Sequence, residues 1–326
     1  MILAMAMPLP RKPVRVDRLL DDPEEVERLL VRHGPYWPVQ RYAANRAEYA
    51  ALSGAGRGAA MVVGPVFRGD WAVGGEVHEG VAPLLHHPVL AEAARQVFDA
   101  EVVRPHTVYV NLTHQLPFPQ GRGHTDIPAF RGVDRTTVPV AFLTIMGQSG
   151  LFEDVRVKVA TAVAWFYAGD DGGLEYWPDG ADQPSVVHEG AISNTAVVAD
   201  NDVMWHRVRP TGRPEDGMPS ITLDAQLEHR GGDRWAIVDG GRTVAEADRS
   251  RVRVSLSWKA TLFEDEADRR RHDEHEDDID LAEVLRRFLA DLDERGIPAA
   301  VPADPLHDEA FVQLLADTYV RFPVEA

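Results

Sequence analysis

The chain has 326 residues, of which 44% are hydrophobic and 26% charged, and its formal net charge at pH 7 is −18. The hydrophobic fraction is ordinary for a globular protein and excludes a wholly disordered chain. The absence of cysteine excludes disulfides, a cysteine nucleophile, iron–sulfur ligation and thiolate zinc sites. Because nucleic-acid binding needs a basic surface, the negative charge predicts no nucleic-acid partner.

The N-terminal residues and the composition indicate a cellular setting. The first residues, MILAMAMPLPRKP, place the basic side chains after the apolar run, which is the reverse of a secretory signal. No stretch reaches the ~18 apolar residues of a membrane span, so we expect a cytoplasmic protein with no membrane partner. Lysine occurs at only three positions (12, 158 and 259), and Ala, Val, Asp and Gly are abundant, which indicates a GC-rich bacterial genome.

Residues 1–100 have a pattern typical of helices. Pro23, with acidic residues on both sides, predicts the start of a helix. Two more helices are expected at about 39–52 and about 90–98. We therefore predict an N-terminal helical region that packs on the rest of the protein.

Residues 101–263 change to short β-branched runs that are broken by Gly, Pro and Asp, which predicts many short strands. Paired glycines between about 211 and 250 predict hairpins inserted into this region. The spacing favours an antiparallel sandwich or barrel, so the expected fold class is a mainly β core with flanking helices. The candidate strands are residues 107–112, 137–144, 160–167, 194–199 and 251–259.

Residues 264–326 return to helical patterns. The acidic run at 264–280 is typical of a solvated helix face. Apolar residues between 279 and 292 repeat with helical spacing, and a last helix is expected at about 308–319.

A candidate metal site begins at His124 and Asp126. On an extended segment, residues i and i+2 point to the same side, so the two side chains can bind one ion together. A second imidazole would complete a facial triad that leaves coordination positions open, as in non-haem Fe(II) oxygenases. His206 is the favoured third ligand because it follows an apolar strand and a polar turn and begins the next expected strand. Weaker candidates are His114, His188 and His229.

A late strand carries a polar face that needs a partner. Alternation sends Arg251, Arg253, Ser255 and Ser257 to one side of residues 251–258. Cationic side chains in a barrel interior are costly without an anion, and a bound dicarboxylate would provide one.

This order of motifs resembles the Fe(II)/2-oxoglutarate-dependent oxygenase superfamily. The pattern is HxD, then Gly172-Gly173-Leu174-Glu175-Tyr176-Trp177, a distal histidine, and Arg-x-Ser on a late strand. The resemblance implies a double-stranded β-helix, the jelly roll of the cupins, over about 107–263. It implies Fe(II) bound by His124, Asp126 and His206, 2-oxoglutarate bound by Arg253 beside Ser255, and O2 as the oxidant.

The resemblance also places residues around the bound molecules. It implies that Tyr109 and Asn111, on the strand before the HxD, touch 2-oxoglutarate. Candidate substrate residues are Phe130 and Arg131 at the pocket mouth and Trp165 and Tyr167 on a core strand. The long interval between His206 and Arg253 leaves Arg251 as a second candidate for the clamp and Arg213 as a third.

The resemblance implies a hydroxylase acting on a small molecule, either an amino acid or a specialised metabolite, with release of succinate and CO2. Asp126 favours oxygen transfer, because related halogenases have a small residue in its place. Two alternatives stay open: a cupin-like isomerase or hydrolase that does not use 2-oxoglutarate, and a non-catalytic binding protein. Neither alternative needs the internal clamp of Arg253 and Ser255. The sequence gives no indication of the oligomeric state.

Overall fold

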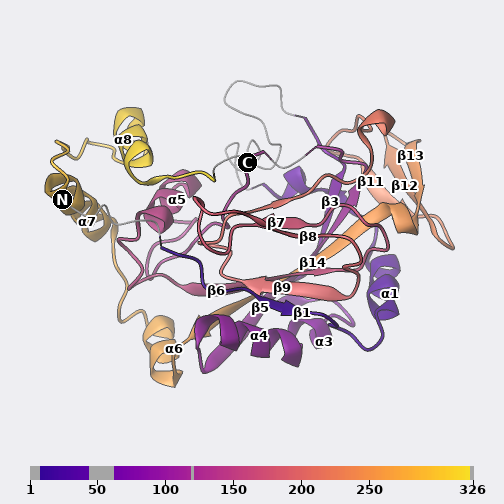
Figure 1. Ribbon diagram of the computed structural model, residues 1–326, viewed down its shortest axis with the longest axis horizontal. Coiled ribbons are helices and arrows are strands. Elements are labelled where there is room, and N and C mark those ends of the chain that lie inside the picture. The colour runs from indigo at the N-terminus through magenta and orange to yellow at the C-terminus, as the bar shows by residue number, and fades with distance from the viewer. Residues whose placement is uncertain (1–7, 44–61, 119–120, 324–326) are drawn as a thin grey trace.

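A large antiparallel sheet forms the centre of the protein. The computed structural model describes residues 8–43, 62–118 and 121–323, and Figure 1 shows how the elements are arranged. The strands of the large sheet follow one another in the order β1-β9-β6-β14-β5-β3-β2, and β4 pairs with β3. They are β1 (Val14–Val16), β2 (Trp37–Pro38), β3 (Val66–Val73), β4 (Glu76–Val77), β5 (Val102–His114), β6 (Lys158–Trp165), β9 (Thr195–Ala199) and β14 (Val252–Phe263).

A small sheet completes a double-stranded β-helix. Its order is β10-β7-β8, with bounds His206–Val208, Leu174–Tyr176 and Val186–His188. An isolated bridge between His124 and His206 adds the HxD segment beside β10. Along the chain, segments therefore alternate between the sheets: β5, the HxD segment, β6, β7 and β8, β9, β10, β14. This alternation confirms the predicted jelly roll.

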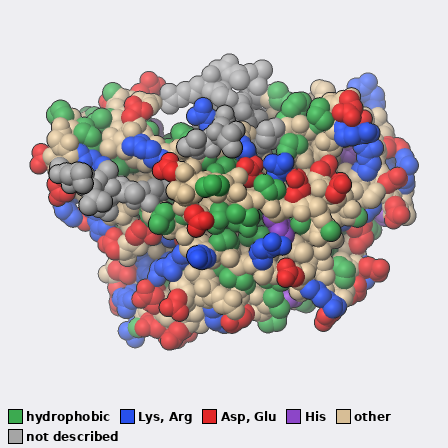
Figure 2. Space-filling model, viewed as in Figure 1, with side chains coloured by type: hydrophobic (Ala, Val, Ile, Leu, Met, Phe, Trp, Pro, Cys, Tyr) green, Lys and Arg blue, Asp and Glu red, His purple; other side chains and the backbone are tan. Residues whose placement is uncertain are grey.

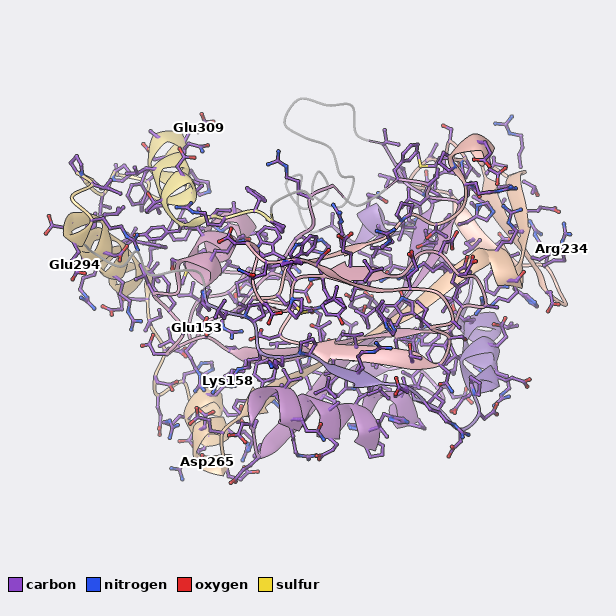
Figure 3. The ribbon with its side chains drawn as sticks, in the orientation of Figure 1. Glu153, Lys158, Arg234, Asp265, Glu294 and Glu309 are labelled. Carbon is purple, nitrogen blue, oxygen red and sulfur yellow. The ribbon has the colours of Figure 1, made fainter. Side chains whose placement is uncertain are left out.

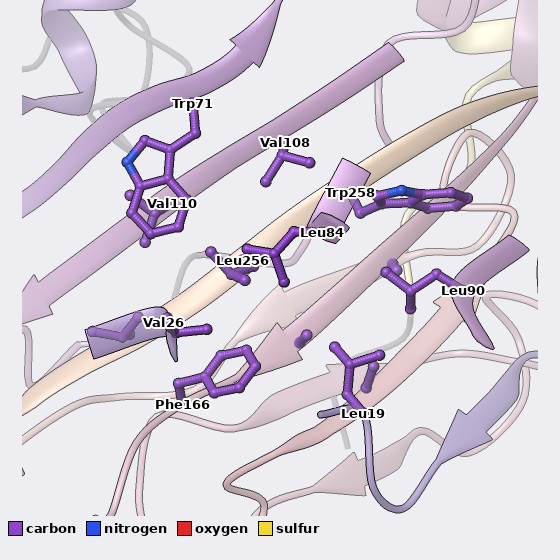
Figure 4. Close-up of a cluster of buried hydrophobic side chains, with 14 of the residues drawn as sticks. Leu19, Val26, Trp71, Leu84, Leu90, Val108, Val110, Phe166, Leu256 and Trp258 are labelled. Carbon is purple, nitrogen blue, oxygen red and sulfur yellow. The ribbon is translucent and has the colours of Figure 1, made fainter. Parts of the chain in front are cut away.

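The two faces of β14 separate the main apolar cluster from the interior of the jelly roll. Its even-numbered residues, such as Leu256 and Trp258, belong to the main apolar cluster (Figure 4). Helices α1 (Glu24–His33), α3 (Ala82–Leu85) and α4 (Pro88–Phe98) contribute residues to that cluster, and α3 and α4 pack on the large sheet. The odd-numbered residues of β14 face away from this cluster, so the alternation predicted from the sequence separates core from site.

The remaining elements lie at the two ends of the jelly roll (Figure 1). Helices α5 (Val140–Ser149), α7 (Leu281–Glu294) and α8 (Glu309–Tyr319) share a second apolar cluster. Helix α6 (Glu266–Asp273) follows β14 and has a mostly exposed, charged surface. At the other end, the predicted insertion forms a separate sheet of β11 (Gln226–His229), β12 (Arg234–Asp239) and β13 (Arg242–Asp248).

Three expectations for the elements need correction. Residues 137–144 were expected as a strand, but they lead into the buried helix α5. The N-terminal region is not only helical, because it also contributes β1, β2 and β3 to the large sheet. The helix expected at 39–52 is a short 3-10 turn, η1 (Val39–Tyr42), and positions 44–52 lie outside the described residues.

Two surface properties bear on the expected partners. Acidic and basic side chains are interspersed over the face shown in Figure 2. In the described part of the chain, no helix combines the length and apolar character needed to cross a bilayer.

Candidate metal centre

The structure brings His124, Asp126 and His206 together. One possible ligand atom from each residue lies within 4.8 Å of those from the other two. The His124 and His206 backbones exchange two N–H···O bonds of 2.9 Å, and the Asp126 N–H donates to the Asn201 carbonyl at 2.8 Å. The backbone therefore fixes both the HxD segment and the distal histidine before any ion binds.

His206 is oriented by its own chain. Its Nδ1 lies 2.9 Å from the Met204 carbonyl oxygen, which leaves Nε2 directed toward Asp126, 3.7 Å from Oδ1. A backbone bond at one ring nitrogen is the usual way in which a metal-binding histidine is held. His124 is exposed as a residue, but desolvation by the atoms around its imidazole, and then His206, lowers the pKa of His124 to about 4. A neutral imidazole is the form that binds a metal.

Asp126 is held as a carboxylate by a cation. Burial alone would raise the pKa of Asp126, but Lys259 and His206 hold it well below its usual range. The Lys259 ammonium lies 2.7 Å from Asp126 Oδ2, and the Thr161 hydroxyl donates to the same oxygen at 3.0 Å. Burial would lower the pKa of Lys259, but Asp126 raises it above the usual value. Two imidazoles and one ionised carboxylate are a donor set suited to Fe(II).

A buried ion pair supports the turn that precedes His206. Arg156 donates to both carboxylate oxygens of Asp200, at 3.0 and 2.7 Å, and its Nε donates to Glu153 at 2.9 Å. Asp202 is buried beside this pair; its Oδ2 lies 3.9 Å from Arg156 Nη1 and has no hydrogen-bond partner among the described residues. Burial, and then Asp200, raises the pKa of Asp202 well above its usual value. These contacts fix the turn from which Asn201 holds Asp126.

Arg253 lies buried on the interior face of β14. Its Nε donates to the Gly172 carbonyl and its Nη1 donates to Ser255 Oγ at 2.9 Å, but Nη2 has no partner among the described residues. Burial lowers the pKa of Arg253 to about 10, and Tyr167 and Asp171 act against that shift. A buried guanidinium with a free nitrogen fits a bound carboxylate. Ser255 contacts the guanidinium, as expected for a residue beside the clamp.

The turn at Gly172 and Gly173 contacts Arg253 of β14 through Gly172. This residue has φ +65, and an added Cβ would lie 2.7 Å from Arg253 Cδ and 2.7 Å from Thr211 Oγ1. The Thr211 hydroxyl is also buried and lacks a partner among the described residues. Thr211, like Lys259 and Thr161, was not singled out from the sequence. Only the polar face of β14, continued to position 259, could have indicated Lys259.

The two alternative arginines lie elsewhere. Arg251 belongs to the 3-10 turn η3 (Arg249–Arg251) before β14, has 58% of its side chain exposed and pairs with Asp216 at 3.3 Å. The side chain of Arg213 is 69% exposed, and Glu215 and Asp216 lie within 4 Å of it.

Tyr109 and Asn111 are the two residues that are expected to touch 2-oxoglutarate. Tyr109 and Asn111 pair with Ser257 and Ser255 across the β5–β14 ladder, so they lie on the interior face with Arg253. The Arg68 guanidinium, from β3, lies 4.0 Å from the centre of the Tyr109 ring.

The expected substrate residues have other contacts in the structure. Trp165 is fully buried in an interior apolar cluster, and the Tyr167 hydroxyl donates to Asp171 at 2.6 Å. Phe130 is buried in the cluster of the C-terminal helices. Arg131 pairs with Asp268 at 2.7 Å and Asp277 at 2.9 Å. These contacts connect Phe130 and Arg131 to the C-terminal region.

Comparison with known proteins gives likenesses at the level of structure. No protein-family profile matches the chain, and no curated protein sequence matches it. A similar solved structure is the Pseudomonas putida prolyl-4-hydroxylase, with 14% identity, coverage of 80% of this chain and 94% of that one, and a TM-score of 0.37. Another is the non-haem α-ketoglutarate-dependent epimerase SnoN from nogalamycin biosynthesis, with 16% identity, 77% coverage of each chain and a TM-score of 0.38.

A third similar structure is an oxidoreductase of the 2OG-Fe(II) oxygenase family from Burkholderia pseudomallei. Its identity is 12% and its TM-score 0.33, and the match covers 60% of this chain and 66% of that one. The strand order is that of a jelly roll, and among the described residues His124, Asp126 and His206 form a group that could hold a metal ion.

Proposed function

We propose that this chain is an Fe(II)- and 2-oxoglutarate-dependent oxygenase that hydroxylates a small molecule, an amino acid or a specialised metabolite, in a bacterial cytoplasm. The observation that carries the proposal is the His124, Asp126 and His206 triad together with the buried Arg253. A metal site alone fits several cupin-like enzymes. A buried guanidinium with a nitrogen free for an anion, on the same interior, is the feature that a dicarboxylate cosubstrate requires.

Each residue has a defined part in this proposal. The two histidines and Asp126 would hold Fe(II) and leave coordination positions for other ligands. Arg253, steadied by Ser255 and the Gly172 carbonyl, binds the distal carboxylate of 2-oxoglutarate. The bound iron supplies the oxidative chemistry that converts 2-oxoglutarate, O2 and a C–H bond into succinate, CO2 and an alcohol.

Anaerobic titration of the metal-free protein tests this function. Fe(II) is added first and 2-oxoglutarate second, and the visible spectrum is recorded after each addition. We expect a metal-to-ligand charge-transfer band only when both are present, because it arises when 2-oxoglutarate chelates the iron. Admission of air should then release succinate.

The Asp126→Ala variant is the control, and it should give no band because it lacks the ionised ligand. If the wild-type protein also gives no band at saturating 2-oxoglutarate, the cupin-like and binding alternatives replace this proposal.

A further inference from the structure

Lys259 occupies an unusual place for a lysine in this protein. It lies on β14, its side chain is 21% exposed, and its ammonium contacts the carboxylate that we assign to the metal. Lys158, on the neighbouring strand β6, is 22% exposed and lies 2.8 Å from Glu264 near the start of α6 (Figure 3). The two lysines match in exposure and in ion-pair length, but Glu264 is 69% exposed and Asp126 only 17%, and only the pair of Lys259 includes a candidate ligand.

The two oxygens of Asp126 have different surroundings. Oδ2 accepts from the Lys259 ammonium at 2.7 Å and from the Thr161 hydroxyl at 3.0 Å. Oδ1 lies 3.7 Å from His206 Nε2, on the side of the imidazoles. Lys259 and Thr161 are direct partners across the β6–β14 ladder, so the sheet register brings both donors to the same oxygen.

This division determines how the carboxylate can bind an ion. An ion held by both oxygens needs lone pairs of Oδ2 that the ammonium and the hydroxyl already use. To bind in that way, Asp126 must turn and lose a charge-assisted hydrogen bond in a partly buried site.

We infer that Lys259 is a positioning residue that, with Thr161, holds Asp126 as a one-oxygen ligand. A bound ion would then keep three coordination positions open, one more than with two-oxygen ligation. The inference rests on the proposed metal site, and it concerns the number of open positions, not the binding of the metal itself.

Water proton relaxation with Mn(II) alone measures the number of open positions. Each open position of bound Mn(II) holds an exchangeable water, so one-oxygen ligation gives three waters and two-oxygen ligation gives two. We expect Lys259→Met to lower the inner-sphere relaxivity per bound Mn(II) by about one third. Lys259→Arg should retain the wild-type value, because a guanidinium still donates to Oδ2. Lys158→Met, the matched control, should also retain it.

Lys259→Gln repeats the test in case the methionine variant does not fold. Its side chain stays polar but is one atom too short to reach Oδ2, so the same loss of about one third is expected. Unchanged relaxivity in the folded Lys259 variants overturns the inference, whatever happens to Mn(II) affinity. Failure of the wild-type protein to bind Mn(II) at all instead removes the metal site, and with it the proposed function.

Discussion

Arg251, just before β14, and Arg253, within it, show how a step of two residues decides the role of a side chain. Alternation along 251–257 places Arg251 and Arg253 on the same side, so the sequence left both as candidates for the clamp. The strand begins only at Val252, and Arg251 therefore lies in a 3-10 turn at the surface, where Asp216 pairs with it. Arg253 lies one pair further into the ladder, opposite Thr113, and is 2% exposed.

Replacement of Arg253 should weaken 2-oxoglutarate binding strongly. Loss of one partner from a buried, hydrogen-bonded charge pair costs roughly 2–5 kcal/mol. At about 1.4 kcal/mol per factor of ten, Arg253→Ala should bind 2-oxoglutarate on the order of 30-fold to several thousand-fold more weakly. Arg253→Lys keeps the charge but loses the planar fork, so it should recover only part of the loss. The measurement is the 2-oxoglutarate dependence of the charge-transfer band at one ionic strength.

Arg251→Ala is the neighbouring control for this prediction. Its guanidinium is mostly exposed and its ion pair is a surface pair, so its loss should change 2-oxoglutarate binding little. If Arg251→Ala binds 2-oxoglutarate weakly and Arg253→Ala binds it like wild type, then Arg251 is the residue that binds the carboxylate. If neither substitution changes 2-oxoglutarate binding, the residue that binds the distal carboxylate lies outside β14.

Among the elements, the turn before β7 brings Gly172 into contact with Arg253 on the large sheet. Gly172 has φ +65 and carries the carbonyl that accepts from Arg253, so its conformation and its missing side chain both serve the guanidinium. Gly190, between β8 and β9, has φ +88 but nothing within 4 Å of an added Cβ. The two glycines thus share the backbone requirement but differ in their contacts.

Gly172→Ala should therefore weaken 2-oxoglutarate binding, and Gly190→Ala should not. Both substitutions place an L-residue in the left-handed region, which costs roughly 1–2 kcal/mol of stability. Only Gly172→Ala also displaces the Arg253 side chain. We expect thermal unfolding to register both changes and the 2-oxoglutarate titration to register only the first. Equal 2-oxoglutarate titration curves for the two variants would show that the turn at Gly172 does not affect 2-oxoglutarate binding by Arg253.

The elements also show where sequence patterns suffice and where they do not. Strands β6, β9 and β14 were found because β-branched or alternating residues lie between turn residues. The pattern at 137–144 predicts a strand because a short apolar run without alternation has no distinguishing period, but residues 140–149 form the buried helix α5. Within the site, His124 and Asp126 are close in sequence and were found together. The contact between Lys259 and Asp126 depends on strand register across distant segments, which no local pattern specifies.

Across the whole molecule, two large apolar clusters include elements that carry or adjoin the site. The main cluster lies between the large sheet and the N-terminal helices, and the second joins α5, α7 and α8. The HxD segment leads directly into the second cluster through Phe130. Backbone bonds reinforce this connection, since the Arg131 N–H donates to Val155 at 2.9 Å and its carbonyl accepts from Ile279 at 3.0 Å. The C-terminal helices therefore anchor the segment that carries two of the three ligands.

Phe288 is the residue at which this anchoring can be tested. It is fully buried on α7 and its ring contacts those of Phe142, Phe152 and Tyr319. Phe288→Ala leaves a cavity that should lower the free energy of unfolding by about 3–5 kcal/mol. Phe118→Ala, at a side chain that is 55% exposed, should change it by less than about 0.5 kcal/mol. Denaturant unfolding measures both variants.

The same substitution should loosen the metal site. Because the HxD segment is connected to this cluster, Mn(II) should protect the amides of the HxD segment from hydrogen exchange less in Phe288→Ala than in wild type. A Phe288→Ala protein with wild-type stability and wild-type protection would show that the C-terminal helices do not support the metal site.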